Sequence, residues 1–421
     1  MMRTFPMTID QLNELTKTFP TPFILYDEKA IRDNMKKFNK AFSIFPKFRE
    51  HYAVKAGPNP YLLKILAEEG CGADCSSMPE LMLSEMSGIK GDHVIFTSNE
   101  TPAEEYKLAY KQGNIINLDD ITHIEFLKKT LGKLPETICF RYNPGNEKTG
   151  CNSIIGKPEE AKYGLTRAQI LEAYKTCKAE GVKHFGLHTM VASNELNPDF
   201  FVDTAKLVFE LAAEVKEKCG VQIEFVDLGG GIGIPYKPGD KEVDLDYVAK
   251  GIRAEYDRVV VPAGLDPLAI YWECGRPITG PFGYLVSKAV HEKHIYREYI
   301  ALDSCMADFM RPGVYGSYHE ISVLGKENEP CDHVYDIVGS LCENSDKFAV
   351  QRSLPKIDIG DYVILHDAGA HGRAMGFNYN GKLRCGEVLL RADGSTKVIR
   401  RKETIEDLFA TLDLDGVKDF Q

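Results

Sequence analysis

The stretch HYAVKAGPNP, residues 51–60, is the first strand-to-helix transition of this chain. Tyr52, Ala53 and Val54 read as the end of a buried strand, and Lys55 follows them directly, ahead of a Gly- and Pro-rich turn. A lysine at a strand end ordinarily extends its charged head to solvent. An amine at the end of an apolar strand can also serve as a nucleophile. Which explanation applies to Lys55 depends on the rest of the sequence.

Strand-like and helix-like segments alternate from about residue 30 to residue 280. Helical patterns such as 59–70 (NPYLLKILAEEG) and 198–220 (PDFFVDTAKLVFELAAEVKEKCG) separate eight short apolar strands. This alternation predicts an α/β fold, a (β/α)8 barrel whose chemistry lies at the C-terminal ends of its strands. The eight expected strands are 48–54, 71–75, 93–98, 113–119, 137–144, 184–191, 223–230 and 268–275.

After residue 283 the sequence pattern changes to short segments rich in β-branched residues and separated by Gly, Asp and Asn. This pattern predicts an antiparallel β domain over 284–421, following a barrel over 30–283. The N-terminal residues 1–29 are expected to contribute to the β domain through the strand-like TPFILYDE, residues 21–28. The Gly- and Asn-rich loop 145–160 could be a lid or a plain connection.

Bulk composition narrows the class of protein. The net charge of −11 disfavours nucleic acids and anionic membranes as partners. The sequence has no apolar run near the roughly 18 residues that a membrane span needs. The eleven cysteines show no metal-like pairing, and Cys71 and Cys75 lack a second pair. We therefore expect a cytoplasmic protein without a metal site.

Two further motifs fall at predicted strand ends. VDLGGGIGIPY, residues 226–236, has three consecutive glycines, whose backbone N–H groups could wrap a phosphate or simply make a tight turn. YWECGRP, residues 271–277, offers Glu273 for a protonated ring nitrogen and Arg276 for a phosphate or carboxylate. A local ion pair at a strand end would explain Glu273 and Arg276 equally well.

The predicted β domain carries three weaker motifs. MRPGVYGSYHE (310–320) contains Arg311 and Tyr315, and GSLCENSDKF (339–348) contains Cys342 and Glu343. HDAGAHGRAMGFNYNG (366–381) ends near Tyr379. Taken singly, each is as easily explained by a loop or by packing.

Taken together, the lysine, the glycine triplet, the Glu-x-Gly-Arg and the Cys-Glu-x-x-Asp resemble one family over about residues 20–407. It is the pyridoxal-phosphate enzymes with an alanine-racemase-like barrel, and within it the diaminopimelate decarboxylases. The resemblance implies a lyase of lysine biosynthesis that converts meso-2,6-diaminopimelate to L-lysine and CO2. It also implies a homodimer whose active sites lie at the interface.

The resemblance also implies roles for individual residues. Lys55 corresponds to the Schiff-base lysine that holds pyridoxal 5'-phosphate, Asp74 to a carboxylate near it, and Cys342 to the general acid that reaches the neighbouring subunit. A catalytic role is implied for His188 as well. Other cofactor contacts are implied for Met190, Ser193, Gly229, Gly230, Gly231, Glu273, Gly275, Arg276 and Tyr379. The distal end of the substrate is implied to contact Arg276, Arg311, Tyr315, Glu343 and Tyr379.

Two positions depart from the family pattern. In HTMVAS, residues 188–193, Met190 stands where the family stacks a histidine on the cofactor ring, so that either Met190 stacks or His188 reaches across. Cys274 stands where the family normally has proline, and we expect this change to have little effect.

Because of Met190, a second hypothesis remains, a related decarboxylase that acts on another carboxylated amine such as carboxynorspermidine. An amino-acid racemase ranks lower, because that chemistry needs a base on each face of the ring. A non-catalytic pyridoxal-phosphate carrier would leave Cys342, Arg311 and Tyr379 unexplained.

Overall fold

The structure is a computed structural model that describes residues 4–145, 157 and 159–418. The chain divides into two compact units. One comprises 31–235 and 239–278, and the other comprises 1–30, 236–238 and 279–421. Most of the predicted loop 145–160 lies outside the described residues.

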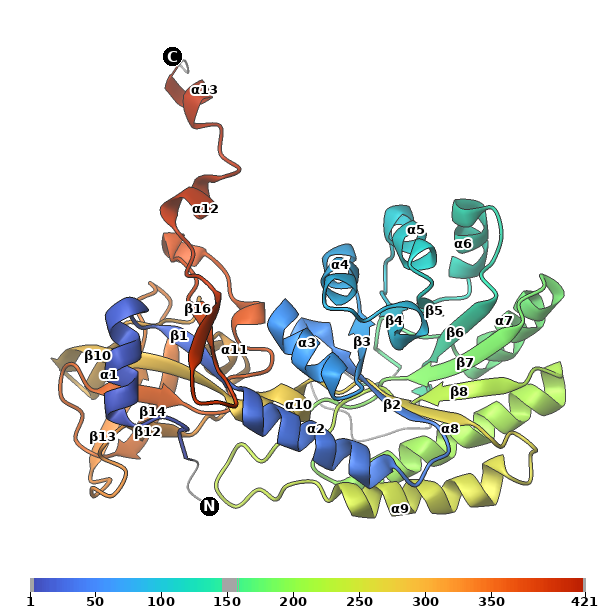
Figure 1. Cartoon of the computed structure of the whole chain (residues 1–421), viewed down its shortest axis with the longest axis horizontal. Coiled ribbons are helices and arrows are strands. Elements are labelled where there is room, and N and C mark those ends of the chain that lie inside the picture. Colours follow the sequence, from blue (N-terminus) through green and yellow to red (C-terminus); the bar gives the residue numbers. More distant parts are fainter. Residues whose placement is uncertain (1–3, 146–156, 158, 419–421) are drawn as a thin grey trace. The chain divides into compact units, whose positions relative to one another are not determined.

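The first unit is a closed barrel of eight parallel strands, as the sequence predicts (Figure 1). The strands are β2 (Phe48–Ala53), β3 (Gly72–Cys75), β4 (Val94–Thr97), β5 (Ile115–Leu118), β6 (Thr137–Tyr142), β7 (His184–Thr189), β8 (Ile223–Asp227) and β9 (Ala269–Trp272). The helices are α2 (Glu28–Phe42), α3 (Pro60–Glu68), α4 (Met78–Met86), α5 (Ala103–Lys111), α6 (His123–Leu131), α7 (Arg167–Ala179), α8 (Pro198–Cys219), α9 (Leu245–Glu255) and α10 (Arg276–Thr279).

Local sequence signals set where these helices begin and end. The Asn59 side chain accepts a hydrogen bond from the Tyr61 N–H, and Pro60 occupies the first helical position of α3. Asn197 caps α8 in the same way, and Gly220 ends that helix with a left-handed backbone. Between β2 and α3, the Gly57 N–H donates to the Val54 carbonyl oxygen at 3.1 Å and closes the turn that carries Lys55.

The barrel core gives the strand ends a rigid support. Trp272, the chain's single tryptophan, is 1% exposed, and its ring centroid lies 5.7 Å from those of Phe42 on α2 and Phe201 on α8. Burying a side chain of this size stabilises the fold by about 2–3 kcal/mol. The residue that follows Trp272 is Glu273, whose carboxylate is therefore held on a well-packed strand.

The second unit is built on a nine-stranded sheet with the path β14-β13-β11-β10-β1-β16-β17, and β15 pairs with β10 and β12. Most pairs are antiparallel, as predicted, but β1 pairs with β16 and β11 with β13 in parallel, so the sheet is mixed. Its strands are β1 (Phe23–Asp27), β10 (Gly283–His294), β11 (Glu298–Leu302), β12 (Ile321–Val323), β13 (His333–Val338), β14 (Lys347–Leu354), β15 (Tyr362–Leu365), β16 (Gly386–Leu390) and β17 (Thr396–Arg400). Its helices are α1 (Ile9–Thr18), α11 (Arg311–Tyr315), α12 (Ile405–Phe409) and α13 (Leu414–Lys418).

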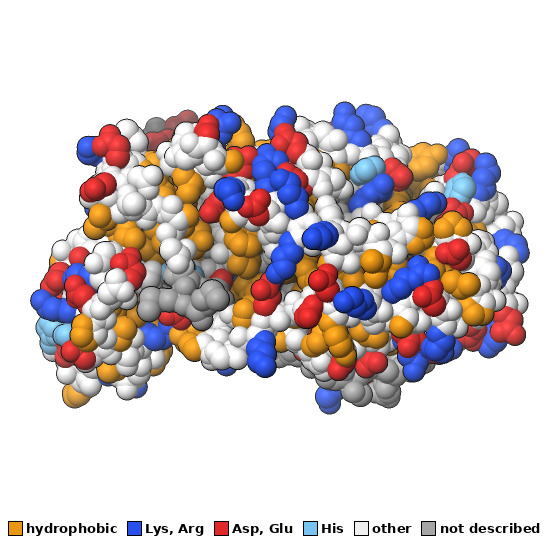
Figure 2. Space-filling model, turned by 60° about the horizontal axis from the view of Figure 1, so that its bottom comes forward, with side chains coloured by type: hydrophobic (Ala, Val, Ile, Leu, Met, Phe, Trp, Pro, Cys, Tyr) orange, Lys and Arg blue, Asp and Glu red, His pale blue; other side chains and the backbone are white. Residues whose placement is uncertain are grey.

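The surface carries charges of both signs. On the face drawn in Figure 2, Lys and Arg side chains lie close to Asp and Glu side chains rather than apart from them. Such a mixture gives little attraction for a phosphate backbone on that face. None of the helices in the described part of the chain is long and apolar enough to cross a membrane.

Candidate active site

Lys55 lies two residues beyond the end of β2, in a one-turn 3-10 helix over Val54–Ala56. Its Nζ lies 2.5 Å from Oδ2 of Asp74, which is on β3 beside β2. The Lys55 side chain is 49% exposed, whereas that of Asp74 is 2% exposed. The amine is therefore open to a ligand but held on one side by a buried carboxylate.

The charges around this amine are strongly coupled. Desolvation acts to lower the pKa of Lys55, but the carboxylates of Asp74 and Glu273 outweigh it and raise that pKa. Burial and the charge of Glu273 raise the pKa of Asp74 to about 7, although Lys55 acts in the opposite direction. The carboxyl beside the amine can thus take up or release a proton near neutral pH.

Glu273 and His188 form a buried pair at the ends of β9 and β7. Their Oε2 and Nε2 atoms are 3.0 Å apart, and His188 is 1% exposed. Burial acts to raise the pKa of Glu273, but His188 outweighs it through its charge and hydrogen bond and lowers that pKa to about 2. Oε1 of Glu273 has no hydrogen-bond partner among the described residues. A buried anion with a free oxygen suits a protonated ring nitrogen.

The glycine triplet forms a turn that packs tightly against its neighbours. Gly229 and Gly231 have φ angles of +67° and +96°. A Cβ on Gly229 would lie 2.3 Å from the Thr189 carbonyl oxygen, and one on Gly230 would lie 2.4 Å from that of Glu273. Glycine is therefore required by close packing and, at Gly229 and Gly231, by the positive φ angles as well.

Met190 contacts this turn directly. The Gly230 N–H donates a hydrogen bond to Met190 Sδ at 3.1 Å. His188, by contrast, faces Glu273. In the described structure the thioether lies at the glycine turn and the imidazole at the carboxylate.

Gly275 and Cys274 hold the exit of β9 against the first strand. A Cβ on Gly275 would lie 2.6 Å from that of Ala56, the residue after Lys55. The Cys274 N–H donates to the buried Glu50 Oε1 at 2.6 Å, a bond that the family's proline could not make. Arg276 follows at the start of α10 and is 6% exposed.

The second unit groups its candidate residues into two contacts. Cys342 Sγ lies 3.4 Å from Tyr379 Oη, and the Cys342 N–H donates to Asn380 Oδ1 at 2.9 Å. The Cys342 hydrogen bond and the charges of Cys342 and Glu343 raise the pKa of Tyr379. Cys342 and Glu343 are exposed. The thiol and the phenol are thus positioned as a pair on an accessible surface.

The second contact of this unit joins Arg311 and Tyr315 on α11. The guanidinium of Arg311 lies 5.7 Å from the Tyr315 ring centroid. Arg311 is 5% exposed, whereas Tyr315 is 48% exposed. Gly313 of the same helix sits where a Cβ would lie 2.4 Å from the Ser345 carbonyl oxygen, so α11 packs against the loop that carries Cys342.

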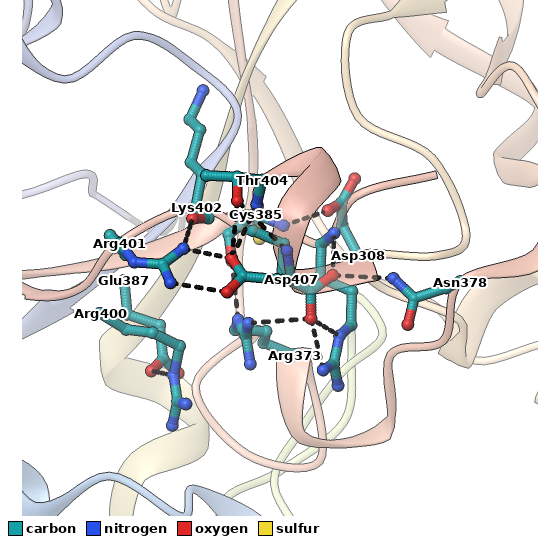
Figure 3. Close-up of polar contacts among 12 residues, drawn as sticks. Asp308, Arg373, Asn378, Cys385, Glu387, Arg400, Arg401, Lys402, Thr404 and Asp407 are labelled. Atoms are coloured by element: carbon teal, nitrogen blue, oxygen red, sulfur yellow. Dashed lines mark hydrogen bonds and ion pairs between the residues drawn. The ribbon is translucent and has the colours of Figure 1, made fainter. Parts of the chain in front are cut away.

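A polar network holds the segment that carries Tyr379 (Figure 3). Glu403 accepts hydrogen bonds from Asn378 Nδ2 at 2.7 Å and from the Arg384 N–H and Nε at 2.8 and 2.6 Å. Asp308 accepts a bond from the Cys385 N–H at 2.7 Å. These carboxylates tie residues 378–385 to the rest of the β domain, next to Tyr379 and Asn380.

Sequence reasoning missed two charged residues at the barrel strand ends. Asp227, the last residue of β8, is fully buried, and only Leu228 separates it from the glycine turn. Arg141 on β6 is 8% exposed, lies 3.5 Å from an Asp119 oxygen and stacks 4.1 Å from the Tyr163 ring centroid. An ionisable residue inside an otherwise apolar strand was the available signal for both.

The barrel cluster fits pyridoxal phosphate. Lys55 supplies an amine for the cofactor aldehyde, whereas the Gly229 and Gly230 N–H groups of the glycine turn already donate to Asp227 Oδ1 and Met190 Sδ. The free buried oxygen of Glu273 suits the ring nitrogen. The donor atoms of His188, Asp227 and Glu273 also lie within 4.8 Å of one another, close enough to share a metal ion. We assign Glu273 of this group to the ring nitrogen.

Comparisons with known proteins agree with this geometry. Residues 28–280 match the model of the pyridoxal-dependent decarboxylase family, pyridoxal binding domain. Protein TabA of Pseudomonas amygdali pv. tabaci is 40% identical over 96% of this chain and 93% of its own length. The diaminopimelate decarboxylase of Methanothermobacter thermautotrophicus is 33% identical over 94% and 92%.

Solved structures extend the similarity to the whole fold. The diaminopimelate decarboxylase of Methanocaldococcus jannaschii superposes with a TM-score of 0.88 at 31% identity, covering 95% of this chain and 94% of that one. That of Helicobacter pylori, complexed with L-lysine, gives 0.87 at 30% identity, covering 96% and 100%. The chain belongs to the pyridoxal-dependent decarboxylase family, and it is an amino-acid decarboxylase that uses pyridoxal phosphate.

Proposed function

We propose that the substrate is meso-2,6-diaminopimelate and that the products are L-lysine and CO2. The observation that carries the proposal is the pair of Arg311 and Tyr315 on α11, a buried guanidinium beside an exposed phenol. A distal carboxylate on the substrate suits this pair, with Arg276 as a second cation, and Glu343 suits the distal ammonium. The diaminopimelate decarboxylases similar to this chain over nearly its full length support the choice.

When bound, pyridoxal phosphate supplies an electron sink for the pair of electrons left when CO2 departs. Lys55 would hold the cofactor aldehyde, and Asp74 would accept or return protons at the lysine amine. Glu273, kept ionised by His188, would hold the proton on the ring nitrogen. Cys342 would deliver a proton to the substrate α-carbon, with Tyr379 orienting the thiol.

We further propose a cytoplasmic homodimer that serves lysine biosynthesis, in which Cys342 acts at the neighbouring subunit's site. The exposed thiol supports this arrangement, since a general acid for a site on its own subunit would be expected to be shielded. The described cysteines are all free, which suits a reducing compartment.

The test is incubation of the purified protein and pyridoxal phosphate with meso-diaminopimelate, with CO2 release measured and the amine identified. Equal amounts of CO2 and lysine support the proposal. L-lysine and L-ornithine serve as control substrates, because they lack the distal carboxylate that Arg311 is proposed to bind. Comparable turnover of L-lysine would contradict the role given to Arg311.

The role of Lys55 has a separate test. A Lys55→Ala protein should fold and lose the visible absorbance of lysine-bound cofactor. Lys64→Ala, on α3, is a matched control on the same unit. Unchanged absorbance in the Lys55 variant would remove the bond between this amine and the cofactor.

Met190 and the 40% identity to TabA favour a second candidate, decarboxylation of another carboxylated amine. A thioether in place of an imidazole changes the polarity beside the cofactor. Cofactor absorbance without release of CO2 from diaminopimelate would shift the proposal to such a substrate.

A further inference from the structure

Asp227 connects the glycine turn to the carboxylate pair of the barrel. It is the last residue of β8 and has no exposed surface. Its Oδ1 accepts a hydrogen bond from the Gly229 N–H at 2.8 Å. Carboxylate oxygens of Asp227 and Glu273 and a ring nitrogen of His188 lie within 4.8 Å of one another. One side chain thus contacts the turn offered to the phosphate and lies beside the group offered to the ring nitrogen.

Two buried carboxyl groups so close together do not both ionise readily. Glu273 ionises more readily than Asp227, because His188 hydrogen-bonds to it. Burial and the charge of Glu273 raise the pKa of Asp227 well above its usual range, although the Gly229 N–H acts in the opposite direction. Oδ2 of Asp227 and Oε1 of Glu273 have no N–H or O–H partner in the described part of the chain. A proton on Asp227 would let Oδ2 donate to Oε1 of Glu273, which has a second lone pair for the ring nitrogen.

The surroundings of Asp227 favour the neutral form. Two cations near Asp227, Glu273 and His188 already pair with other carboxylates. Lys55 bonds to Asp74, and Arg141 lies beside Asp119. The titratable groups that face Asp227 are Glu273, Asp74, Cys139, Tyr271 and Cys274, with His188 bonded to Glu273. Of these groups, His188 can carry a positive charge, and its ring nitrogen bonds to Glu273 rather than to Asp227.

We propose that Asp227 is a positioning residue that works as a neutral acid, accepting from Gly229 and donating its proton to Glu273. It thereby fixes the distance between the phosphate turn and the ring-nitrogen carboxylate. The cofactor would then meet both groups already placed. The proposal rests on the cofactor of the family and is independent of which amino acid is decarboxylated.

The test compares Asp227→Asn with Asp227→Ala in the full-length protein. Asparagine keeps both hydrogen bonds, because its oxygen can accept from Gly229 and its NH2 can donate to Glu273. We expect the dissociation constant for pyridoxal phosphate to stay within about threefold in Asp227→Asn and to rise at least about tenfold in Asp227→Ala. Equal weakening in both variants would overturn the neutral role, and no weakening in either would overturn the positioning role.

Glu273→Gln is the matched control, since Glu273 is proposed to act as an anion. The isosteric amide of Glu273→Gln cannot carry that negative charge, so kcat should fall by a factor much larger than any change in KM. If Glu273→Gln and Asp227→Asn behave alike, the two carboxyls do not differ in charge and the proposal fails.

A measurement on the cofactor-free protein needs no activity and survives poor folding of Asp227→Ala. The infrared difference spectrum between the wild type and Asp227→Asn should contain the carbonyl band of a protonated carboxyl group at neutral pH. The difference for Glu273→Gln should contain a carboxylate band instead. A carboxylate band in the Asp227 difference would overturn the proposal.

Discussion

Replacing Gly231 by alanine should destabilise the barrel by an amount that its surroundings define. Gly231 has a φ of +96°, a region that costs an L-residue about 1–2 kcal/mol. The added Cβ would also lie 2.6 Å from both the Cβ and the carbonyl oxygen of Ala192. Overpacking of this kind costs about 1–3 kcal/mol. The expected loss in the free energy of unfolding is therefore about 2–5 kcal/mol.

Gly239→Ala separates the two contributions. Gly239 has nearly the same φ, +94°, but a Cβ there would meet nothing within 4 Å. Both variants gain similarly from the reduced freedom of the unfolded chain. Gly231→Ala should thus lose about 1–3 kcal/mol more than Gly239→Ala, the difference being the contact with Ala192.

The assay is chemical denaturation of the cofactor-free protein followed by the fluorescence of Trp272. This single tryptophan is buried in the barrel and reports on that unit. Pyridoxal phosphate should also bind more weakly to Gly231→Ala, because the turn must shift. Equal destabilisation in the two variants would show that close packing does not explain the glycine.

Three further predictions concern other parts of the chain. Burial lowers the pKa of His51 to about 3 from an ordinary 6.5, so between these pH values the unfolded state binds more protons than the folded state. The free energy of unfolding therefore falls by an amount on the order of 4 kcal/mol as the pH drops through that window. His51→Phe should abolish this fall, which would appear as a lower pH midpoint of acid unfolding. Met190→Leu keeps the volume but removes the acceptor of the Gly230 N–H, and amide exchange there should quicken roughly fivefold, whereas an unchanged rate would show that the sulphur does not hold the turn. Glu403→Gln leaves Asn378 and Arg384 facing a neutral amide and should lower the free energy of unfolding by about 1–3 kcal/mol. Amide hydrogen exchange in residues 373–381 should become faster, and an unchanged exchange rate would argue against the anchoring role of Glu403.

The barrel was predictable because its strands and helices repeat a pattern that each local segment carries. All eight expected strands are present. Lys55 was expected at a strand end and lies in the turn just beyond it, since the strand ends at Ala53 and Pro60 starts the next helix. Such small shifts follow from backbone hydrogen bonding, which composition does not reveal.

Pairing between distant segments was less accessible. The parallel pair of β1 and β16 joins residues 23–27 to 386–390, and no local signal encodes that partnership. β10 runs over Gly283–His294, across the expected domain boundary. The sequence pattern indicated strands there but not their order, because order depends on long-range contacts.

The candidate site divides in the same way. Chemistry-bearing residues such as Glu273 and the glycine triplet stood out by type and position. Asp227 gave a weaker signal, an acid in an otherwise apolar strand, and its burial beside Glu273 appears only in three dimensions. The assigned roles of these residues stay predictions until the variants are measured.

The tight glycine turn has a consequence for how this protein can evolve. Each of its three residues is blocked by a different neighbour, Thr189, Glu273 or Ala192, so no single side chain can be added without moving a strand end. Tyr315 and Glu343, by contrast, are exposed on the other unit and can be exchanged without such clashes. Descendants of this chain should therefore acquire new substrates through the β domain while the cofactor cradle stays fixed.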